Sequence, residues 1–327
     1  MKILEAIFTG ITQGAMIALV ALGYTMVYGV LKLINFAHSE VFMMAAYFGL
    51  VFLALFIGDV TAVTGIVSPH AAETTFSVAF GSLRAHPFAS TAAATVLAML
   101  GASLLGIGVE RVAYRPLRGR GRGALVRVTP LVTALGMSVL LQNLAQLLFT
   151  ARFRPYPQVL GGVVHIPQLG AVSTSRALIL AASVLVMVGL ELIVKRTWFG
   201  KAMRALSANE EAARLMGVRT SRVISMTFAL GSSLAALGAV LYCLDQSQVY
   251  PTMGVVIGTR AFVAAVLGGI GSITGAMLGG LLIGVIGELV KLTDYSGGVD
   301  VLVFVVLILV LLVRPAGLLG STRAEKV

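Results

Sequence analysis

Cysteine is nearly missing from this sequence of 327 residues, which contains Cys243 and no other. A single cysteine excludes an internal disulfide, a CxxC redox pair and a zinc site built from thiolates. Histidine is also scarce: the four histidines lie on separate segments, without the spacing of a metal site or a catalytic pair. We therefore expect neither a metal site nor acid–base chemistry from them. They are His38, His70, His86 and His165.

Nucleotide-binding and hydrolase signatures are missing as well. Gly200 and Lys201 are followed by Ala202, and the earlier glycine of a phosphate-binding P-loop is absent. The sequence contains no HExxH zinc motif and no GxSxG nucleophile elbow. We expect a chain that is not an enzyme and that holds no cofactor of its own.

Charged side chains make up only 11% of the chain, whereas 58% of its residues are hydrophobic and its mean hydropathy is +0.99. A soluble domain carries about a quarter charged residues and under half apolar ones. The excess of apolar residues must face lipid, so the composition excludes an ordinary soluble protein.

The net charge of +11 comes from basic residues gathered in two gaps between apolar runs, at 110–127 and 196–222. Basic loops beside apolar spans mark the cytoplasmic side of a membrane protein. Neither gap carries the interleaved aromatic residues on which bases stack, so we expect no nucleic-acid partner.

Apolar stretches recur at about the 20-residue length of a membrane-spanning helix. Since lipid cannot satisfy free backbone groups, each should be helical. We predict an all-α polytopic membrane protein with about eight to ten transmembrane helices, in which residues 1–327 form a single transmembrane permease domain. The candidate spans are 7–30, 38–58, 89–109, 128–149, 176–195, 223–243, 255–270, 273–291 and 299–314.

The loops between these spans predict the orientation of the later part of the chain. With both basic gaps in the cytoplasm, the proline-rich loop 150–175 faces outside. The polar segment 59–88 is predicted to be a second exterior loop. The side of the N-terminus stays open, because a re-entrant piece near residues 31–38 would reverse it.

The cytoplasmic segment 196–222 contains a short helix with its own end signals. Ser207 and Glu210 have the spacing of a capping box, Glu211 and Ala212 follow, and Gly217 is placed to end the helix. Its small, alanine-rich apolar face suits a protein groove better than lipid, so we favour a docking surface over a plain surface loop.

Four strings together give the chain a family resemblance: GITQGAMIALVALGYTMVYGVLKLINFAHSEVFMMAAY, ERVAYRPLR, GKAMRALSANEEAARLMGV and AFVAAVLGGIGSITGAMLGGLLIG. They resemble the LivH-type permease subunit of branched-chain amino-acid ABC importers. The resemblance implies that residues 196–222 are the coupling loop that contacts the ATPase subunits. The residues to which it assigns this contact, with Ser207 at the start of the same segment, are Ala208, Glu210, Glu211, Ala212 and Gly217.

A glycine-rich run near the end of the chain has two interpretations. Glycines at four-residue spacing allow helices to approach closely in lipid. A break at Gly268–Ser272 is also typical of a hinge beside a transport pathway. The candidate packing or hinge residues are Gly268, Gly269, Gly271, Ser272, Gly275 and Gly279.

Polar residues at membrane depth are costly in lipid, so each should face a partner helix or a wet cavity. For the charged members, such as Arg260, we favour structural pairing with an acid over substrate contact. For the neutral members we favour the pathway, because a weakly held zwitterion needs only a few hydrogen bonds. The pathway candidates are Tyr24, Thr25, Asn35, His38, Gln142 and Asn143.

The composition predicts a multi-pass membrane protein, and the resemblance implies a permease of the bacterial inner membrane that imports branched-chain or related amino acids by alternating access. The resemblance implies a second homologous permease subunit, two cytoplasmic ATPase subunits that bind ATP and Mg, and an extracytoplasmic substrate-binding protein. The alternative is an ion-coupled secondary amino-acid transporter. It would need a coupling acid, for which Glu40, Asp245 and Glu288 are available, although none falls mid-span in a clear pair.

Overall fold

The computed structural model describes residues 2–57, 86–117, 125–157, 162–166, 170–293 and 296–320. Its α-helices are α1 (Lys2–Leu31), α2 (His38–Ile57), α5 (Pro87–Val109), α6 (Leu125–Phe149), α7 (Thr174–Arg196), α8 (Trp198–Ala208), α9 (Glu210–Leu215), α10 (Thr220–Gln246), α11 (Met253–Gly268), α12 (Ile273–Lys291) and α13 (Val299–Val313). A π-helical turn, η2 (Glu110–Tyr114), continues α5, and short 3-10 turns lie at Arg115–Leu117 and Ser296–Gly298.

Seven of the described helices are long and apolar enough to cross a membrane, and α11 and α13 are shorter apolar helices. Together they account for the nine predicted apolar runs, so the all-helical polytopic fold is confirmed. Two antiparallel strand pairs were not predicted: β1 (Arg154–Pro155) with β4 (Gln248–Val249), and β2 (Val163–Ile166) with β3 (Gly170–Ser173). The predicted exterior loop 59–88 lies almost entirely outside the described residues.

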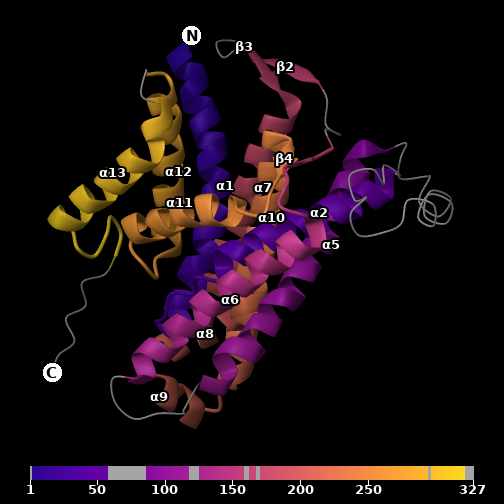
Figure 1. The fold of residues 1–327 in the computed structure, drawn as a ribbon. Coiled ribbons are helices and arrows are strands. Elements are labelled where there is room, and N and C mark those ends of the chain that lie inside the picture. The colour runs from indigo at the N-terminus through magenta and orange to yellow at the C-terminus, as the bar shows by residue number, and fades with distance from the viewer. Residues whose placement is uncertain are drawn as a thin grey trace.

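The N-terminal end of α1 lies at the same end of the bundle as β2 and β3, and α9 lies at the opposite end (Figure 1). With α9 on the cytoplasmic side, as its basic surroundings predict, the N-terminus is external. On that prediction, the arrangement favours the external N-terminus of the two alternatives that the sequence left open.

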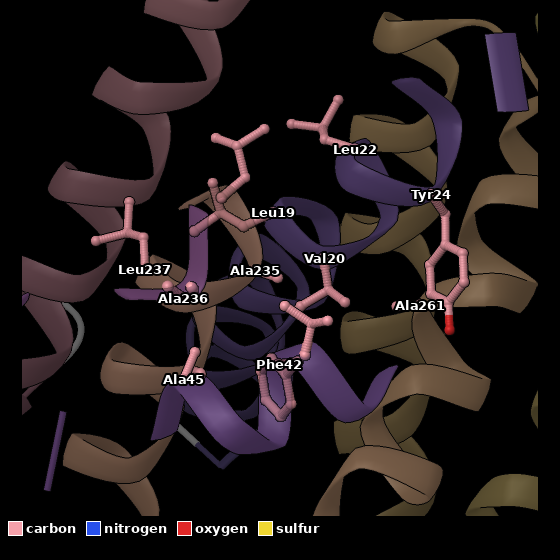
Figure 2. Close-up of a cluster of buried hydrophobic side chains, with 14 of the residues drawn as sticks. Leu19, Val20, Leu22, Tyr24, Phe42, Ala45, Ala235, Ala236, Leu237 and Ala261 are labelled. Carbon is pink, nitrogen blue, oxygen red and sulfur yellow. The ribbon is translucent and has the colours of Figure 1, made fainter. Parts of the chain in front are cut away.

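Helix α1 forms the centre of the bundle and α6 lies on its rim. The most apolar 18-residue stretch of α1 is 83% buried, against 17% for that of α6. Figure 2 shows Leu19 and Val20 of α1 among Ala235 and Ala236 of α10 and Phe42 of α2. In lipid, such close packing of small side chains replaces the hydrophobic drive that water supplies elsewhere.

Glycines let α12 pack directly on α1. A methyl group added at Gly10 would lie 2.7 Å from the Val285 Cα, and one added at Gly284 would lie 2.3 Å from the Gly14 Cα. The two backbones therefore touch, and a side chain at either position would force the helices apart.

Helix α2 begins inside the bundle rather than at its cytoplasmic end. His38, its first residue, lies against Gly23 of α1. Gly23 precedes the end of α1 by eight residues, which is about 12 Å of helix. Residues 32–37 thus return from the cytoplasmic end into the bundle. Helix α11 lies crosswise at the centre (Figure 1), and its first turn meets the start of α2.

Candidate functional site: a cytoplasmic coupling surface and a buried polar cluster

The predicted coupling segment forms two helices, α8 and α9, that break at Asn209. The Asn209 side chain accepts a hydrogen bond from the Ala212 N–H at 3.0 Å and caps α9. The prediction that Ser207 provides this cap is wrong, since Ser207 and Ala208 lie in the last turn of α8. Asparagine one residue before Glu210 places its carbonyl oxygen within reach of the free N–H groups, and asparagine is as good a cap as serine.

Gly217 ends α9, as predicted. Its φ of +84° is left-handed, where glycine carries no steric penalty. The Gly217 N–H donates to the Arg214 carbonyl and the Val218 N–H to the Ala213 carbonyl, each at 3.0 Å. This pair of bonds is a Schellman motif, which satisfies the last carbonyls of the helix.

The surface of α9 is open to solvent. Glu210, Glu211 and Ala212 are exposed, and the apolar side chains of Leu215 and Met216 are 89% and 85% exposed. We call these five residues the coupling surface. Adjacent large apolar side chains with this exposure have nothing in the chain to pack against, which is typical of an interaction surface.

A groove of about 750 Å³ separates α9 from the inner end of α1. The residues that line it include Leu31, Leu33, Tyr114, Arg115, Glu210, Glu211 and Arg214. One side-chain contact spans from this side of α1 to α8: the Lys32 Nζ donates to the Ser207 Oγ at 3.2 Å. Lys32 has a left-handed φ of 55°, which turns the chain back into the bundle.

The returning segment carries Asn35 into a buried polar cluster. The Asn35 Oδ1 accepts hydrogen bonds from the Tyr114 hydroxyl at 2.8 Å and from the Ala37 N–H at 3.1 Å. The second bond is an Asx turn, which holds the chain in position for α2 to begin. Tyr114 belongs to η2, so Asn35 ties the start of α2 to the cytoplasmic end of α5.

Tyr24, Thr25 and His38 lie in the same region. The rings of Tyr24 and His38 meet edge to face, with centroids 4.8 Å apart. The His38 Nε2 is buried without a hydrogen-bond partner among the described residues, as is the Thr25 Oγ1. A methyl group at Gly23 would lie 2.2 Å from this nitrogen, so glycine is what admits the imidazole. The structure therefore brings together Tyr24, Asn35 and His38, since the His38 N–H donates to the Asn35 carbonyl at 3.1 Å, and Thr25 is buried next to Tyr24 on α1.

Gln142 and Asn143 do not belong to this cluster. They lie on α6 at the rim, where Asn143 is exposed and its Nδ2 donates to the Val139 carbonyl of the same helix at 2.8 Å. Their positions within a predicted span could not reveal which face of α6 is turned inward.

The glycines in and after the predicted break have two different roles: some pack against α11, and others form the turn between α11 and α12. Gly275 and Gly279 face α11, because added methyl groups would lie 2.2 Å from the carbonyl oxygens of Gly268 and Ala264. Gly269 and Gly271 have φ of +103° and +94° in the turn between α11 and α12. Gly271 has open space around it and so does not extend the packing ridge. The Ser272 Oγ accepts from the Gly275 N–H at 3.1 Å and caps α12.

The charged residues at depth are paired, as predicted for Arg260. Its Nε lies 2.7 Å from the Asp300 Oδ1, which joins α11 to α13. Asp245 and Glu288, two acids available for ion coupling, are paired with Arg176 and Lys291. Glu40 differs, because neither of its carboxylate oxygens has a hydrogen-bond partner among the described residues. The sequence offered Glu40 as a polar residue at membrane depth and as a possible coupling acid, and the return of residues 32–37 into the bundle is what buries it.

At the external end, residues 150–157 form a strap across the bundle. β1 of the strap pairs with β4, and the Tyr156 N–H donates to the Ser247 carbonyl at 2.9 Å. The Tyr156 side chain is 2% exposed and enters the bundle, where a methyl group at Gly49 would lie 2.7 Å from its hydroxyl. Burial raises the pKa of the Tyr156 phenol well above its ordinary value, so the hydroxyl keeps its proton.

Comparisons with known proteins bear on this geometry. The family model described as "Branched-chain amino acid transport system / permease component" matches residues 6–312. The chain is 38% identical over 331 residues to the high-affinity branched-chain amino acid transport system permease protein BraD of Pseudomonas aeruginosa, covering 99% of this chain and 98% of BraD. It is also 38% identical over 331 residues to the corresponding protein LivH of Escherichia coli K12, covering 99% of this chain and 97% of LivH.

A shorter similarity links the chain to the ribose import permease protein RbsC of Bacillus subtilis, at 33% identity over 139 residues, covering 40% of this chain and 43% of RbsC. No solved structure matches the chain. These relatives give no support to an ion-coupled secondary transporter, because they are permease components of transport systems. The chain belongs to the branched-chain amino-acid transport permease family and is a multi-pass membrane protein that serves as a transport component.

Proposed function

We propose that this chain is the single-domain permease of an ATP-driven importer that moves branched-chain or related amino acids across the bacterial inner membrane. Two cytoplasmic ATPases bind ATP and Mg, a second homologous permease completes the pathway, and an extracytoplasmic binding protein delivers the amino acid. The names of BraD and LivH support the substrate class. The sequence carries no P-loop of its own, which fits hydrolysis by separate subunits.

The observation that carries the proposal is the coupling surface. A helix of six residues is too short to persist alone, yet α9 is capped at both ends and presents Leu215 and Met216 outward. Such a helix fits the helix-in-groove mode of recognition, in which apolar side chains enter a partner's cleft. We infer that each ATPase subunit receives one such helix and moves it.

In the proposed mechanism of alternating access, the helix bundle switches between two conformations that open to opposite sides of the membrane. In the present packing, the Tyr156 hydroxyl and Val240 both lie against Gly49, and a groove lies beside α9 at the opposite end of the bundle. The pathway residues Tyr24, Thr25, Asn35 and His38 lie between these ends. ATP binding by the partners shifts the population toward the other packing, because the partners bind the two packings with different affinities.

A pair of charge substitutions at opposite ends of the molecule tests this proposal. Leu215→Glu with Met216→Glu places two charges in the expected ATPase groove, and we expect the ATPases to be lost on purification and ATP-driven uptake to stop. Phe153→Glu, on the external strap, is the matched control because Phe153 is also apolar and 66% exposed. It should leave ATPase binding intact. Full retention of the ATPases by the Leu215→Glu/Met216→Glu variant would refute the docking role of α9.

A further inference from the structure

Glu40, in the first turn of α2, is a buried acid that forms no ion pair with a described residue. It is 0% exposed, and neither carboxylate oxygen accepts a hydrogen bond from any described residue. The neighbouring Ser39 hydroxyl donates to the Phe36 carbonyl at 2.9 Å instead. The ion pairs formed among the described residues all use other acids.

A second buried glutamate shows what a structural acid looks like in this bundle. Glu110 is also 0% exposed, but its Oε2 accepts a hydrogen bond from the Ser225 hydroxyl at 2.8 Å. Asp245, 4% exposed at its side chain, is paired with Arg176 and accepts from Gln246. A carboxylate without such a partner at membrane depth is costly, and an acid of this kind marks a functional site whose partner is a cation.

Glu40 lies where two helices meet inside the membrane. A methyl group at Gly254, in the first turn of α11, would lie 2.8 Å from the Glu40 Oε2. One turn later, a methyl group at Gly258 would lie 2.2 Å from the Ser39 Cβ. The α11 backbone therefore closes directly over the carboxylate, and a small separation of α11 from α2 would uncover it. Discontinuous helices that meet at mid-depth are where transporters place their substrate sites.

Aromatic rings lie beside this junction. The ring of Phe262 on α11 is 6.2 Å from that of Tyr24 and 6.0 Å from that of Phe36, measured between centroids. Aromatic faces accept both an ammonium group and an aliphatic side chain, which are two of the three parts of a branched-chain amino acid.

We propose that Glu40 receives the α-ammonium group of the transported amino acid when α11 separates from α2. This inference rests on the proposed function, and it adds a named counter-ion for the substrate at membrane depth. The bare carboxylate is then the empty half of an ion pair, which the passing zwitterion completes for as long as α11 stays open. No bond is made or broken in this step.

Three ligands test the charge requirement on the purified permease–ATPase complex without binding protein. L-leucine and L-leucinol carry the ammonium group, whereas 4-methylpentanoate has the same carbon skeleton with a carboxylate alone. The first two should raise the thermal unfolding midpoint and the third should not. Equal stabilisation by 4-methylpentanoate and leucinol, or no shift by any of the three, would overturn the proposal.

Glu40→Gln keeps the shape and removes the charge. We expect its affinity for leucinol to fall by about tenfold to a hundredfold, the effect of losing a charged hydrogen-bond partner. Without ligand its unfolding midpoint should rise, because an unpaired buried charge is gone. Glu110→Gln, the matched control, should keep the leucinol response. Unchanged leucinol affinity in Glu40→Gln would refute this inference alone, whereas failure of the unaltered transporter to take up amino acid with ATP would refute the proposed function.

Discussion

The two ends of the bundle are held by different kinds of contact. At the external end, main-chain pairing of β1 with β4 and the insertion of Tyr156 fix the strap, and the Arg176 Nε lies 3.1 Å from the Asp245 Oδ1. At the cytoplasmic end, the exposed Lys32–Ser207 hydrogen bond spans from the inner end of α1 to α8, beside an open groove. Tyr156 at the external end is buried, whereas the Lys32–Ser207 hydrogen bond is exposed.

This difference indicates how the molecule responds to its partners. A solvated hydrogen bond contributes little to stability, so the cytoplasmic end can move with whatever grips the coupling surface. The external strap must lose main-chain hydrogen bonds and expose a tyrosine before it opens. The buried Tyr156 hydroxyl has no hydrogen-bond partner among the described residues, so no hydrogen bond of this group is broken when Tyr156 leaves the bundle. We infer that the packing closed to the outside is the resting one.

The largest expected effect comes from locking the external strap. Pro155 and Gln248 are directly opposed in the β1–β4 pair, and Cys243, the only native cysteine, is buried. In the Pro155→Cys/Gln248→Cys double variant, oxidation should abolish uptake and a reducing agent should restore it, because the strap can no longer open. Uptake by proteoliposomes measures this, with each single variant oxidised as the control. Full uptake by the crosslinked protein would show that the strap does not move.

A moderate effect is expected at the contact between Lys32 and Ser207. Lys32→Ala should slow transport by about twofold to tenfold while ATP hydrolysis continues. The variant loses the modest hydrogen bond that joins the segment before Asn35 to the last turn of α8, next to α9. Ser207→Ala should act alike, and the double variant should be no worse than either single one. Lys201→Ala, an exposed lysine on α8, serves as the control. Additive losses in the double variant would mean that the two side chains act separately.

The smallest effect is expected at the cap of α9. Asn209→Ala should destabilise this helix by about 1 kcal/mol, because the Ala212 N–H loses its acceptor. Hydrogen exchange of the α9 amides should become faster by roughly fivefold, while Asn209→Ser should keep most of the protection. Unchanged exchange in Asn209→Ala would show that α9 is held by its neighbours rather than by its cap.

Much of the fold was predictable because lipid imposes a strong rule on sequence. Each apolar run had to be a helix, and Arg260 had to find an acid, which it does in Asp300. Gly217 was identifiable as a helix end because its role is local. The cap was misplaced by two residues because Ser207 and Asn209 both precede Glu210 and both are good caps.

The site was less predictable because it depends on contacts between distant segments. The sequence offered a re-entrant piece near residues 31–38 only as one alternative and could not show that the chain returns by about 12 Å into the bundle, which is what buries Glu40. In the same way, Tyr156 lies in a proline-rich loop that gives no sign of entering the core. The partner of Asn35 is Tyr114, 79 positions away, and only the packing of α5 against α2 and α10 brings them together.

The central claim is that this chain moves amino acids only when ATPases drive it through α9. The most direct measurement is amino-acid accumulation in proteoliposomes that contain the assembled transporter and binding protein, with ATP supplied on the α9 side and no ion gradient. We predict accumulation that requires ATP on that side and disappears in the Leu215→Glu/Met216→Glu variant. Accumulation driven by a proton or sodium gradient without nucleotide would contradict the account.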